Sequence, residues 1–346
     1  MNNFSKTLLG WYAEHKRDLP WRNCTDPYRI WISEIILQQT RVVQGYAYFL
    51  RFVERFPDVR SLASASEDEV MKYWQGLGYY SRARNLHAAA RSMQGVFPTS
   101  YEGVRALKGV GDYTAAAICS FAYGMPYAVV DGNVYRVLAR YFGIDTPIDS
   151  TEGKKMFAAL ADRLLDRSCP ADYNQALMDF GAVQCTPQAP DCLFCPLAAG
   201  CQARARGQVQ QLPVKQHKTK TTNRYFNYIY VRMGAYTLLQ KRTEDDIWKN
   251  LFELPLLETE RDWSVEEFLA SPQLHSLLAE GESPVFRPLQ RGVRHVLSHR
   301  VLYANFYEAL LPEGSASFPG CLRVRVDDLE NYAVPRLVQA FLEKYL

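Results

Sequence analysis

Apolar and polar residues in the first two hundred positions recur with the period of α-helices. One such run is 49–56, where Phe49, Phe52, Val53 and Phe56 recur with spacings of three and four residues. Asp26-Pro27 has the chemistry of a helix N-cap and first turn, and Ser66 with Glu69 matches a capping box. Further helices are predicted at 82–93, 114–123, 134–142 and 154–165. Because nothing here alternates with period two for long, we expect an all-α region.

The pattern changes after residue 201. Residues 225–231 are aromatic and β-branched, and Gly234-Ala235 can turn this run into a hairpin with 236–240. Strands are also predicted at 296–309 and 322–326, and a closing helix at 334–345. We therefore expect the second domain to be α+β.

A basic segment separates the two regions. Residues 204–224 contain six Lys or Arg and no acidic residue, which is typical of an exposed linker. We predict a helical domain at 1–203, a basic linker at 204–222 and an α+β domain at 223–346. Residues 1–215 carry a net charge of +4 and the remainder −1. This mild asymmetry gives weak support to a polyanion bound by the first domain or the linker.

Composition narrows the class of protein. The 346 residues are 48% hydrophobic, with 40 Lys and Arg against 37 Asp and Glu, which excludes a disordered chain. Eight cysteines are too few for a disulfide scaffold. No targeting signal opens the chain, and Gly124 and Pro126 interrupt the uncharged stretch 113–130. We interpret that stretch as a short buried helix, and the whole as a soluble cytosolic protein.

Four cysteines cluster before the linker. They form the pattern C-x6-C-x2-C-x5-C and are Cys185, Cys192, Cys195 and Cys201. Four thiolates within seventeen residues can converge on one centre, and the ligand set by itself permits zinc and iron–sulfur equally. The other four are dispersed and are expected to be small buried hydrophobes: Cys24, Cys119, Cys169 and Cys321.

A glycine-containing turn is predicted between two helices. Lys108-Gly109-Val110-Gly111 can direct backbone N–H groups outward beside a helix N-terminus, where a phosphate oxygen would fit. The same sequence is also common as a plain helix–helix connection. Asp131, in V-V-D-G-N-V, can cap the helix that follows it, and the apolar residues before it place its carboxylate at the edge of a core.

Taken together, these motifs resemble the helix–hairpin–helix DNA glycosylase superfamily. The hairpin L-x-G-V-G, the Asp in V-D-G-N-V and the cysteine spacing carry that resemblance. The segments W-I-S-E-I-I-L-Q-Q-T at 31–40 and Q-G-L-G-Y-Y-S-R-A-R-N at 75–85 narrow it to the A/G-specific adenine DNA glycosylases, the MutY family. The match spans roughly 18–201, and H-V-L-S-H at 295–299 is similar to the family's lesion-reading motif.

The resemblance implies a base-excision-repair enzyme that removes adenine opposite 8-oxoguanine or G in double-stranded DNA, and one 4Fe–4S cluster on the four cysteines. It makes Glu34 the general acid and Asp131 the carboxylate that faces the oxocarbenium ion, with Asn133 orienting nearby groups. Tyr113 stands where the endonuclease III branch has a nucleophilic Lys, so we expect a monofunctional glycosylase. By the same resemblance the protein would be a monomer in the bacterial cytosol.

Other positions of the family motifs map onto DNA and base contacts. Arg22 and Gln175 match the adenine pocket. Leu37, Gln39 and Tyr79 match the wedge that enters the duplex, and the hairpin from Lys108 to Gly111 binds DNA. Leu297, Ser298 and His299 match the lesion reader. Residue type alone, without the family resemblance, would predict other places for these side chains. Leu37 and Tyr79 would be core residues, Arg22 a solvated side chain and His299 a buried histidine.

The chain also departs from the family pattern. Lys108 replaces the usual Pro, and the loop 186–191 lacks the Lys or Arg often found there. The C-terminal domain resembles a Nudix fold around 247–255 but has no R-E-x-x-E-E helix, so we expect neither catalytic Mg²⁺ nor a nucleotide cofactor. Three alternatives stay open: an endonuclease III-like pyrimidine glycosylase with lyase activity, a non-catalytic DNA-binding iron–sulfur protein, and a Nudix-type hydrolase.

Overall fold

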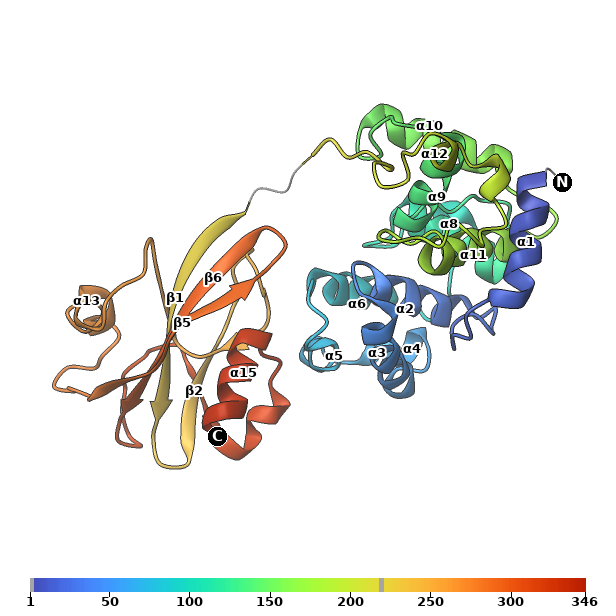
Figure 1. Ribbon diagram of the computed structural model, residues 1–346. Coiled ribbons are helices and arrows are strands. Elements are labelled where there is room, and N and C mark those ends of the chain that lie inside the picture. The colour runs from blue at the N-terminus through green and yellow to red at the C-terminus, as the bar shows by residue number, and fades with distance from the viewer. Residues whose placement is uncertain (1–2, 218–220) are drawn as a thin grey trace. The chain divides into compact units, whose positions relative to one another are not determined.

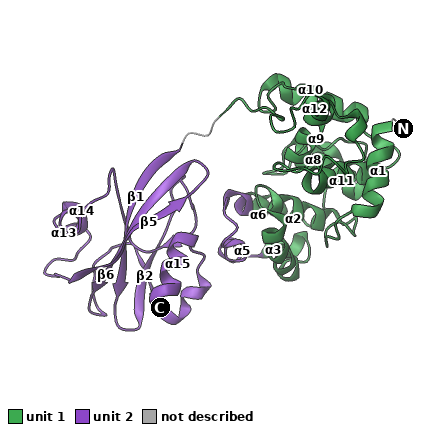
Figure 2. Ribbon diagram, in the orientation of Figure 1, with its two compact units in different colours: residues 1–64, 85–218 green, residues 65–84, 219–346 purple. Residues whose placement is uncertain are grey.

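The computed structural model describes residues 3–217 and 221–346. The chain divides into two compact units, residues 1–64 with 85–218 and residues 65–84 with 219–346 (Figure 2). The boundaries expected near 203 and 222 stay a prediction. Residues 65–84 belong to the second unit although they lie within the segment expected to be helical domain.

The first unit is built from helices, as Figure 1 shows. These are α1 (Asn3–His15), α2 (Pro27–Leu37), α3 (Val42–Arg55), α4 (Val59–Ser64), α6 (Ser81–Ser92, which begins in the second unit), α7 (Tyr101–Arg105), α8 (Asp112–Tyr123), α9 (Gly132–Phe142), α10 (Thr151–Leu164), α11 (Pro170–Asp179) and α12 (Gln202–Ala205). A π-helical turn, Phe180–Gln184, extends α11, and a 3-10 turn covers Ala198–Gly200. The predicted all-α region is confirmed.

Local sequence signals fix several of these helix ends. Asp26 accepts a hydrogen bond from the Tyr28 N–H at 2.9 Å, and Pro27 occupies the first turn of α2. Gly124 and Gly143 end α8 and α9 with φ of 63° and 66°, a left-handed backbone that favours glycine. The uncharged stretch 113–130 therefore contains one short helix that stops at Gly124. No helix among the described residues is long and apolar enough to cross a bilayer.

The predicted linker is only partly exposed. Leu212 is 5% exposed and packs in the helical core. Its carbonyl accepts from Arg140 Nε at 3.0 Å, and the Val214 carbonyl accepts from the Ile148 N–H at 3.0 Å. The apolar residues of this segment therefore anchor it to the first unit. Residues 218–220, also expected to be linker, lie outside the described residues.

The second unit contains α5 (Glu67–Trp74) and two β-sheets. One sheet has the order β4-β1-β6-β5: β4 (Leu256–Thr259), β1 (Thr222–Arg232), β6 (Arg300–Leu310) and β5 (Phe286–Val296). The other has the order β3-β2-β7: β3 (Phe252–Glu253), β2 (Tyr236–Lys241) and β7 (Leu322–Arg325). The remaining helices are α13 (Val265–Leu269), α14 (Pro272–His275), the 3-10 helix Val326–Asn331 and α15 (Arg336–Tyr345). The expected α+β class is confirmed.

Strand register places the polar turn between β5 and β6 at one edge of the larger sheet. β1 and β6 run parallel, with Tyr225 opposite Tyr303, and β5 pairs antiparallel with β6. Most of the strand predicted at 296–309 is confirmed as β6, but the predicted strand begins too early. It is interrupted at 297–299, where the chain reverses between β5 and β6. The consecutive polar residues Ser298, His299 and Arg300 were the available signal for this turn.

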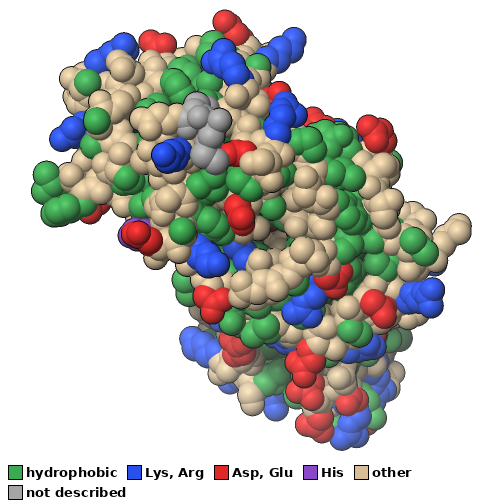
Figure 3. Space-filling model, turned by 90° about the vertical axis from the view of Figure 1, so that its right-hand side faces the viewer, with side chains coloured by type: hydrophobic (Ala, Val, Ile, Leu, Met, Phe, Trp, Pro, Cys, Tyr) green, Lys and Arg blue, Asp and Glu red, His purple; other side chains and the backbone are tan. Residues whose placement is uncertain are grey.

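On the face drawn in Figure 3, the charged side chains of the described residues do not gather into a single patch. In the view of Figure 3, basic and acidic side chains are interspersed with apolar and neutral ones. This distribution agrees with the small net charge of +3. Charge alone therefore does not identify a nucleic-acid surface in this view.

Candidate active site

Glu34 lies on α2 with its side chain in the interior of the first unit. It is 7% exposed, and the Tyr113 hydroxyl, from α8, donates to its Oε2 at 2.9 Å. Burial raises the pKa of Glu34 to about 7, against the opposing effects of the Tyr113 hydrogen bond and the Arg22 charge; the nearby Asp131 adds to the increase. A carboxyl with this pKa carries a proton in a large fraction of molecules near neutral pH.

Asp131 precedes α9 and is the N-cap of that helix. Its Oδ1 accepts from the Val134 N–H at 2.8 Å, and its Oδ2 accepts from Asn133 Nδ2 at 2.7 Å. Burial raises the pKa of Asp131, while these hydrogen bonds favour the charged form. The two carboxyl groups therefore differ: Glu34 accepts one side-chain hydrogen bond, and Asp131 is held by donors on both oxygens.

Both carboxyl groups line one cleft of about 520 Å³ in the first unit. Residues 34 and 131 are far apart in the sequence, and the structure brings them together in this cleft. The same cleft is lined by five other predicted site or neighbouring residues: Arg22, Leu37, Tyr113, Asn133 and Gln175. A space of this volume can hold a purine, since ligand pockets commonly measure about 300–1,000 Å³.

Arg22 and Gln175 are joined through Tyr12, and Arg22 also contacts Asp179; the sequence singled out neither Tyr12 nor Asp179. Arg22 Nη1 donates to Asp179 Oδ2 at 2.7 Å and to the Tyr12 hydroxyl at 3.4 Å. Tyr12 in turn donates to Gln175 Oε1 at 2.8 Å. Asp179 lies one helical turn after Gln175 in N-Q-A-L-M-D, and that spacing was the available signal.

The glycine turn connects α7 and α8, as predicted. Gly109 has φ 82°, Val110 is 4% exposed, and Gly111 is the N-cap of α8. Lys108 is exposed. A Cβ on Gly109 would lie 2.8 Å from the Asn85 side chain, so this position requires glycine for two reasons.

The four clustered cysteines line one small cavity beside Arg140. Arg140 Nη1 lies 3.4 Å from Cys185 Sγ and also donates to the Thr186 carbonyl at 2.7 Å, which orders the loop after Cys185. Among the described side chains, no three His, Cys, Asp or Glu gather at metal-binding distance. The shared cavity and the four sulfur donors nonetheless fit a thiolate-bound centre. Of the four dispersed cysteines, Cys119 is buried as expected, while the other three are partly exposed.

Two of the three predicted wedge residues, Gln39 and Tyr79, are exposed and have a positive φ. Leu37 ends α2 and lines the cleft, and Gln39, which is exposed, has φ 56°. Tyr79, in the second unit, has φ 48° and is 40% exposed, so reading it as a core residue is wrong. Non-glycine residues with positive φ are uncommon and often occur at functional positions.

The predicted lesion-reading residues form the turn between β5 and β6. Ser298 and His299 are exposed, which excludes the alternative of a buried histidine, and Leu297 is half-buried. They line a pocket of about 450 Å³ within the second unit. Tyr79 lines it too, and its hydroxyl hydrogen-bonds with Ser298 Oγ.

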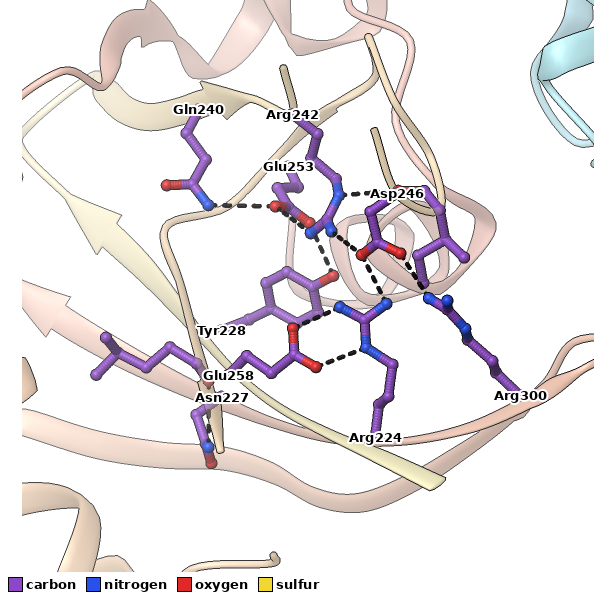
Figure 4. Close-up of polar contacts among 11 residues, drawn as sticks. Arg224, Asn227, Tyr228, Gln240, Arg242, Asp246, Glu253, Glu258 and Arg300 are labelled. Carbon is purple, nitrogen blue, oxygen red and sulfur yellow. Dashed lines mark hydrogen bonds and ion pairs between the residues drawn. The ribbon is translucent and has the colours of Figure 1, made fainter. Parts of the chain in front are cut away.

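One wall of this pocket was not predicted. It is formed by 246–248, and its Asp246 binds three arginines (Figure 4): Arg300 at 2.5 Å, Arg224 at 2.6 Å and Arg242 at 3.0 Å. Burial would raise the pKa of Asp246, but the arginine hydrogen bonds lower it to about 2. Because Arg300 directly follows His299, this ion cluster anchors the end of the turn between β5 and β6.

Two carboxyl groups in one cleft, a glycine turn between helices and a cysteine loop define a helix–hairpin–helix DNA glycosylase. The family model for the "HhH-GPD superfamily base excision DNA repair protein" matches residues 32–163, and the NUDIX domain model matches 227–344. A solved "thermostable thymine-DNA glycosylase" is 31% identical, with a TM-score of 0.55, over 59% of this chain and 95% of that one. An endonuclease III–DNA complex (20% identical, TM-score 0.51) shares the fold, over 59% of this chain and 94% of that one.

Relatives narrow the class further. The adenine DNA glycosylase of Buchnera aphidicola subsp. Acyrthosiphon pisum is 31% identical over 99% of this chain and 97% of its own length. The adenine DNA glycosylase of Homo sapiens is 43% identical over 60% of this chain and 41% of its own. The chain belongs to the adenine DNA glycosylase family, and it is an enzyme that hydrolyses N-glycosyl bonds.

Proposed function

We propose that the protein removes adenine mispaired with 8-oxoguanine or G in double-stranded DNA. The observation that carries this is the cleft in which Glu34 and Asp131 meet, where Glu34 accepts one side-chain hydrogen bond and Asp131 accepts one on each oxygen. The fold match and the adenine glycosylase relatives support the substrate class.

In this reaction the adenine leaves the base stack and enters the cleft. Glu34, kept protonated by burial, donates its proton to the purine ring and so improves the leaving group. Asp131 faces the sugar and stabilises the developing oxocarbenium ion. Its hydrogen bonds from Asn133 and the Val134 N–H hold the carboxylate in place. Water then completes hydrolysis.

Tyr113 supports a monofunctional enzyme. Its hydroxyl is committed to Glu34, and a phenol cannot form the Schiff base needed for β-elimination. The sugar–phosphate strand would therefore stay intact until the abasic product meets alkali. The same hydrogen bond orients the acid, which gives Tyr113 a second role.

The second unit would read the base opposite the adenine. The Ser298 hydroxyl can accept the N7 hydrogen that distinguishes 8-oxoguanine from guanine, and Leu297 and His299 complete that side of the pocket. We assign residues 1–203 to excision, 204–222 to a linker and 223–346 to this readout. Gln39 and Tyr79 would occupy the space left by the extruded adenine, assisted by Leu37.

The glycine turn and the four clustered cysteines have further roles in this proposal: the turn would bind DNA, and the cysteines would stabilise the loop that contains them. The turn from Lys108 to Gly111 would bind a phosphate through backbone N–H groups and the Lys108 charge. Cys185, Cys192, Cys195 and Cys201 would hold one 4Fe–4S cluster, which would crosslink the loop between α11 and α12. The enzyme would act as a monomer.

A glycosylase assay tests the proposal. Duplexes with A opposite 8-oxoguanine, A opposite G and A opposite T are incubated with protein, and each sample is divided for treatment with or without alkali. We expect abasic sites from the first two duplexes, with strand breaks only after alkali. Pyrimidine release with direct cleavage would instead support the endonuclease III-like alternative, and binding without base release would support a non-catalytic protein.

A further inference from the structure

A fully buried carboxylate contacts the arginine of the base pocket. Asp179, at the C-terminal end of α11, has no exposed surface. Its Oδ1 accepts from Arg17 Nε at 2.8 Å and Nη2 at 2.5 Å, and its Oδ2 accepts from Arg22 Nη1 at 2.7 Å. One buried anion thus holds two arginines, and Arg22 lines the cleft with Glu34.

The contact continues from Arg22 to the pocket amide. Arg22 Nη1 also donates to the Tyr12 hydroxyl, and this hydroxyl lies 2.8 Å from Gln175 Oε1. A hydroxyl has one proton, so Tyr12 accepts from Arg22 and donates its proton to Gln175. Tyr12 thereby holds Oε1 of Gln175, which keeps a second lone pair, and the Nε2 of the oriented amide can donate to a base.

We propose that Asp179 is a positioning residue for base excision: it fixes Arg22 beside Glu34 and, through Arg22 and Tyr12, presents the Gln175 amide nitrogen to the base. This inference rests on the proposed function, because it assigns Glu34 the role of acid. It also predicts which part of the base Gln175 meets, namely an acceptor nitrogen of the purine ring.

The charge of Asp179 acts on Glu34 through Arg22. Tyr113 of α8, Asp131 before α9 and Arg22 before α2 act on Glu34, and Arg22 is the cation that lowers its pKa. Three further arginines line the same cleft: Arg17, which Asp179 also binds, Arg41 and Arg136. Asp179 neutralises the Arg22 cation, so removing its charge is expected to favour the ionised, inactive form of Glu34.

The test compares single-turnover adenine release against pH for wild type, Asp179→Asn and Asp179→Glu. Activity requires protonated Glu34, so it falls as pH rises through the Glu34 pKa. We expect Asp179→Asn to move the midpoint of this fall down by about one pH unit, and Asp179→Glu to restore it. The matched control is Asp162→Asn, which breaks an Asp–Arg pair whose two side chains are more than half exposed, and it should keep the wild-type midpoint.

Tyr12→Phe separates orientation from charge. It removes the hydrogen bond to Gln175 but leaves the Arg22–Asp179 pair, so the rate should fall about tenfold with the midpoint unchanged. A wild-type rate in this variant would overturn the relay to Gln175. This holds even if Asp179→Asn does not fold, because the aromatic ring is retained.

A second readout does not depend on catalysis. Carboxyl ¹³C NMR of labelled protein, with Glu34→Gln for assignment, follows the Glu34 titration in the absence of DNA. An unchanged titration in Asp179→Asn would overturn the charge effect. If wild type released no adenine, the proposed function would fail, and this titration would still decide the effect of Asp179 on Glu34.

Discussion

Replacing Glu34 by Gln tests the proposed acid with minimal change in shape. The amide oxygen can still accept from Tyr113, so the hydrogen bond at 2.9 Å need not be lost. What disappears is the transferable proton. At pH 7, a carboxyl with the ordinary glutamate pKa of 4.5 is protonated in roughly 0.3% of molecules, whereas one with a pKa of about 7 is protonated in roughly half. Burial therefore enriches the active form more than a hundredfold.

The expected loss follows from this comparison. General acids contribute about 10² to 10⁴ in rate, so Glu34→Gln should reduce single-turnover adenine release by at least a hundredfold. Binding to lesion duplexes, measured by fluorescence anisotropy, should change little. In wild type the rate should fall as pH rises through about 7. A Glu34→Gln rate within threefold of wild type would refute the role of this residue as acid.

The same raised pKa, which favours catalysis, lowers the stability of the fold at high pH. A glutamate whose folded-state pKa is higher than its unfolded value stabilises the fold most below pH 4.5, and that contribution is lost as pH rises through about 7. At pH 8, Glu34→Gln should therefore unfold at a higher urea concentration than wild type, and near pH 4.5 the two should converge. Equal midpoints at pH 8 would contradict burial of the charge.

Three further outcomes are expected. Asp131→Asn should lower adenine release by at least a hundredfold and retain binding, because the neutral amide cannot stabilise a cation; rapid release would remove this role. Ser298→Ala with His299→Ala should bring the rates for A opposite 8-oxoguanine and A opposite G closer together, and an unaltered ratio would argue against the lesion reader. Gly109→Ala should reduce the free energy of unfolding by about 1–2 kcal/mol, whereas Gly111→Ala, where nothing lies within 4 Å of a Cβ, should lose far less; equal denaturation midpoints would contradict the turn geometry.

The helices could be predicted because their signals are local. The Asp26 cap, the amphipathic spacing of 49–56 and the glycines after α8 and α9 each act within a few residues. The same holds for the glycine turn between α7 and α8. The β5–β6 turn was missed because its polar residues Ser298 and His299 were interpreted as part of a strand.

In the candidate site, too, some residues could be predicted from local motifs, whereas the contacts between distant residues could not. Glu34 and Asp131 were found through motifs, but their meeting in one cleft depends on tertiary packing, in which α2 contacts α8 and α11 contacts both α8 and α9. Asp179 contacts Arg17 and Arg22 across about 160 residues of sequence, and no spacing rule reaches that far. Asp246 escaped notice because two of its arginines, Arg224 and Arg300, lie 22 and 54 positions away in the sequence.

The ion cluster around Asp246 has a consequence for how the enzyme responds to salt. Arg224, Arg242 and Arg300 are matched by Asp246 and two glutamates, so the cluster offers no surplus cation to a phosphate. Duplex affinity in general weakens steeply as added salt competes for the phosphates. In the proposed function, the β5–β6 turn beside this neutral cluster distinguishes 8-oxoguanine from G. The ratio of the rates for these two opposing bases should therefore change much less than the affinity when salt is added. The affinity for the duplex and the specificity for the opposing base could then be changed independently in this protein.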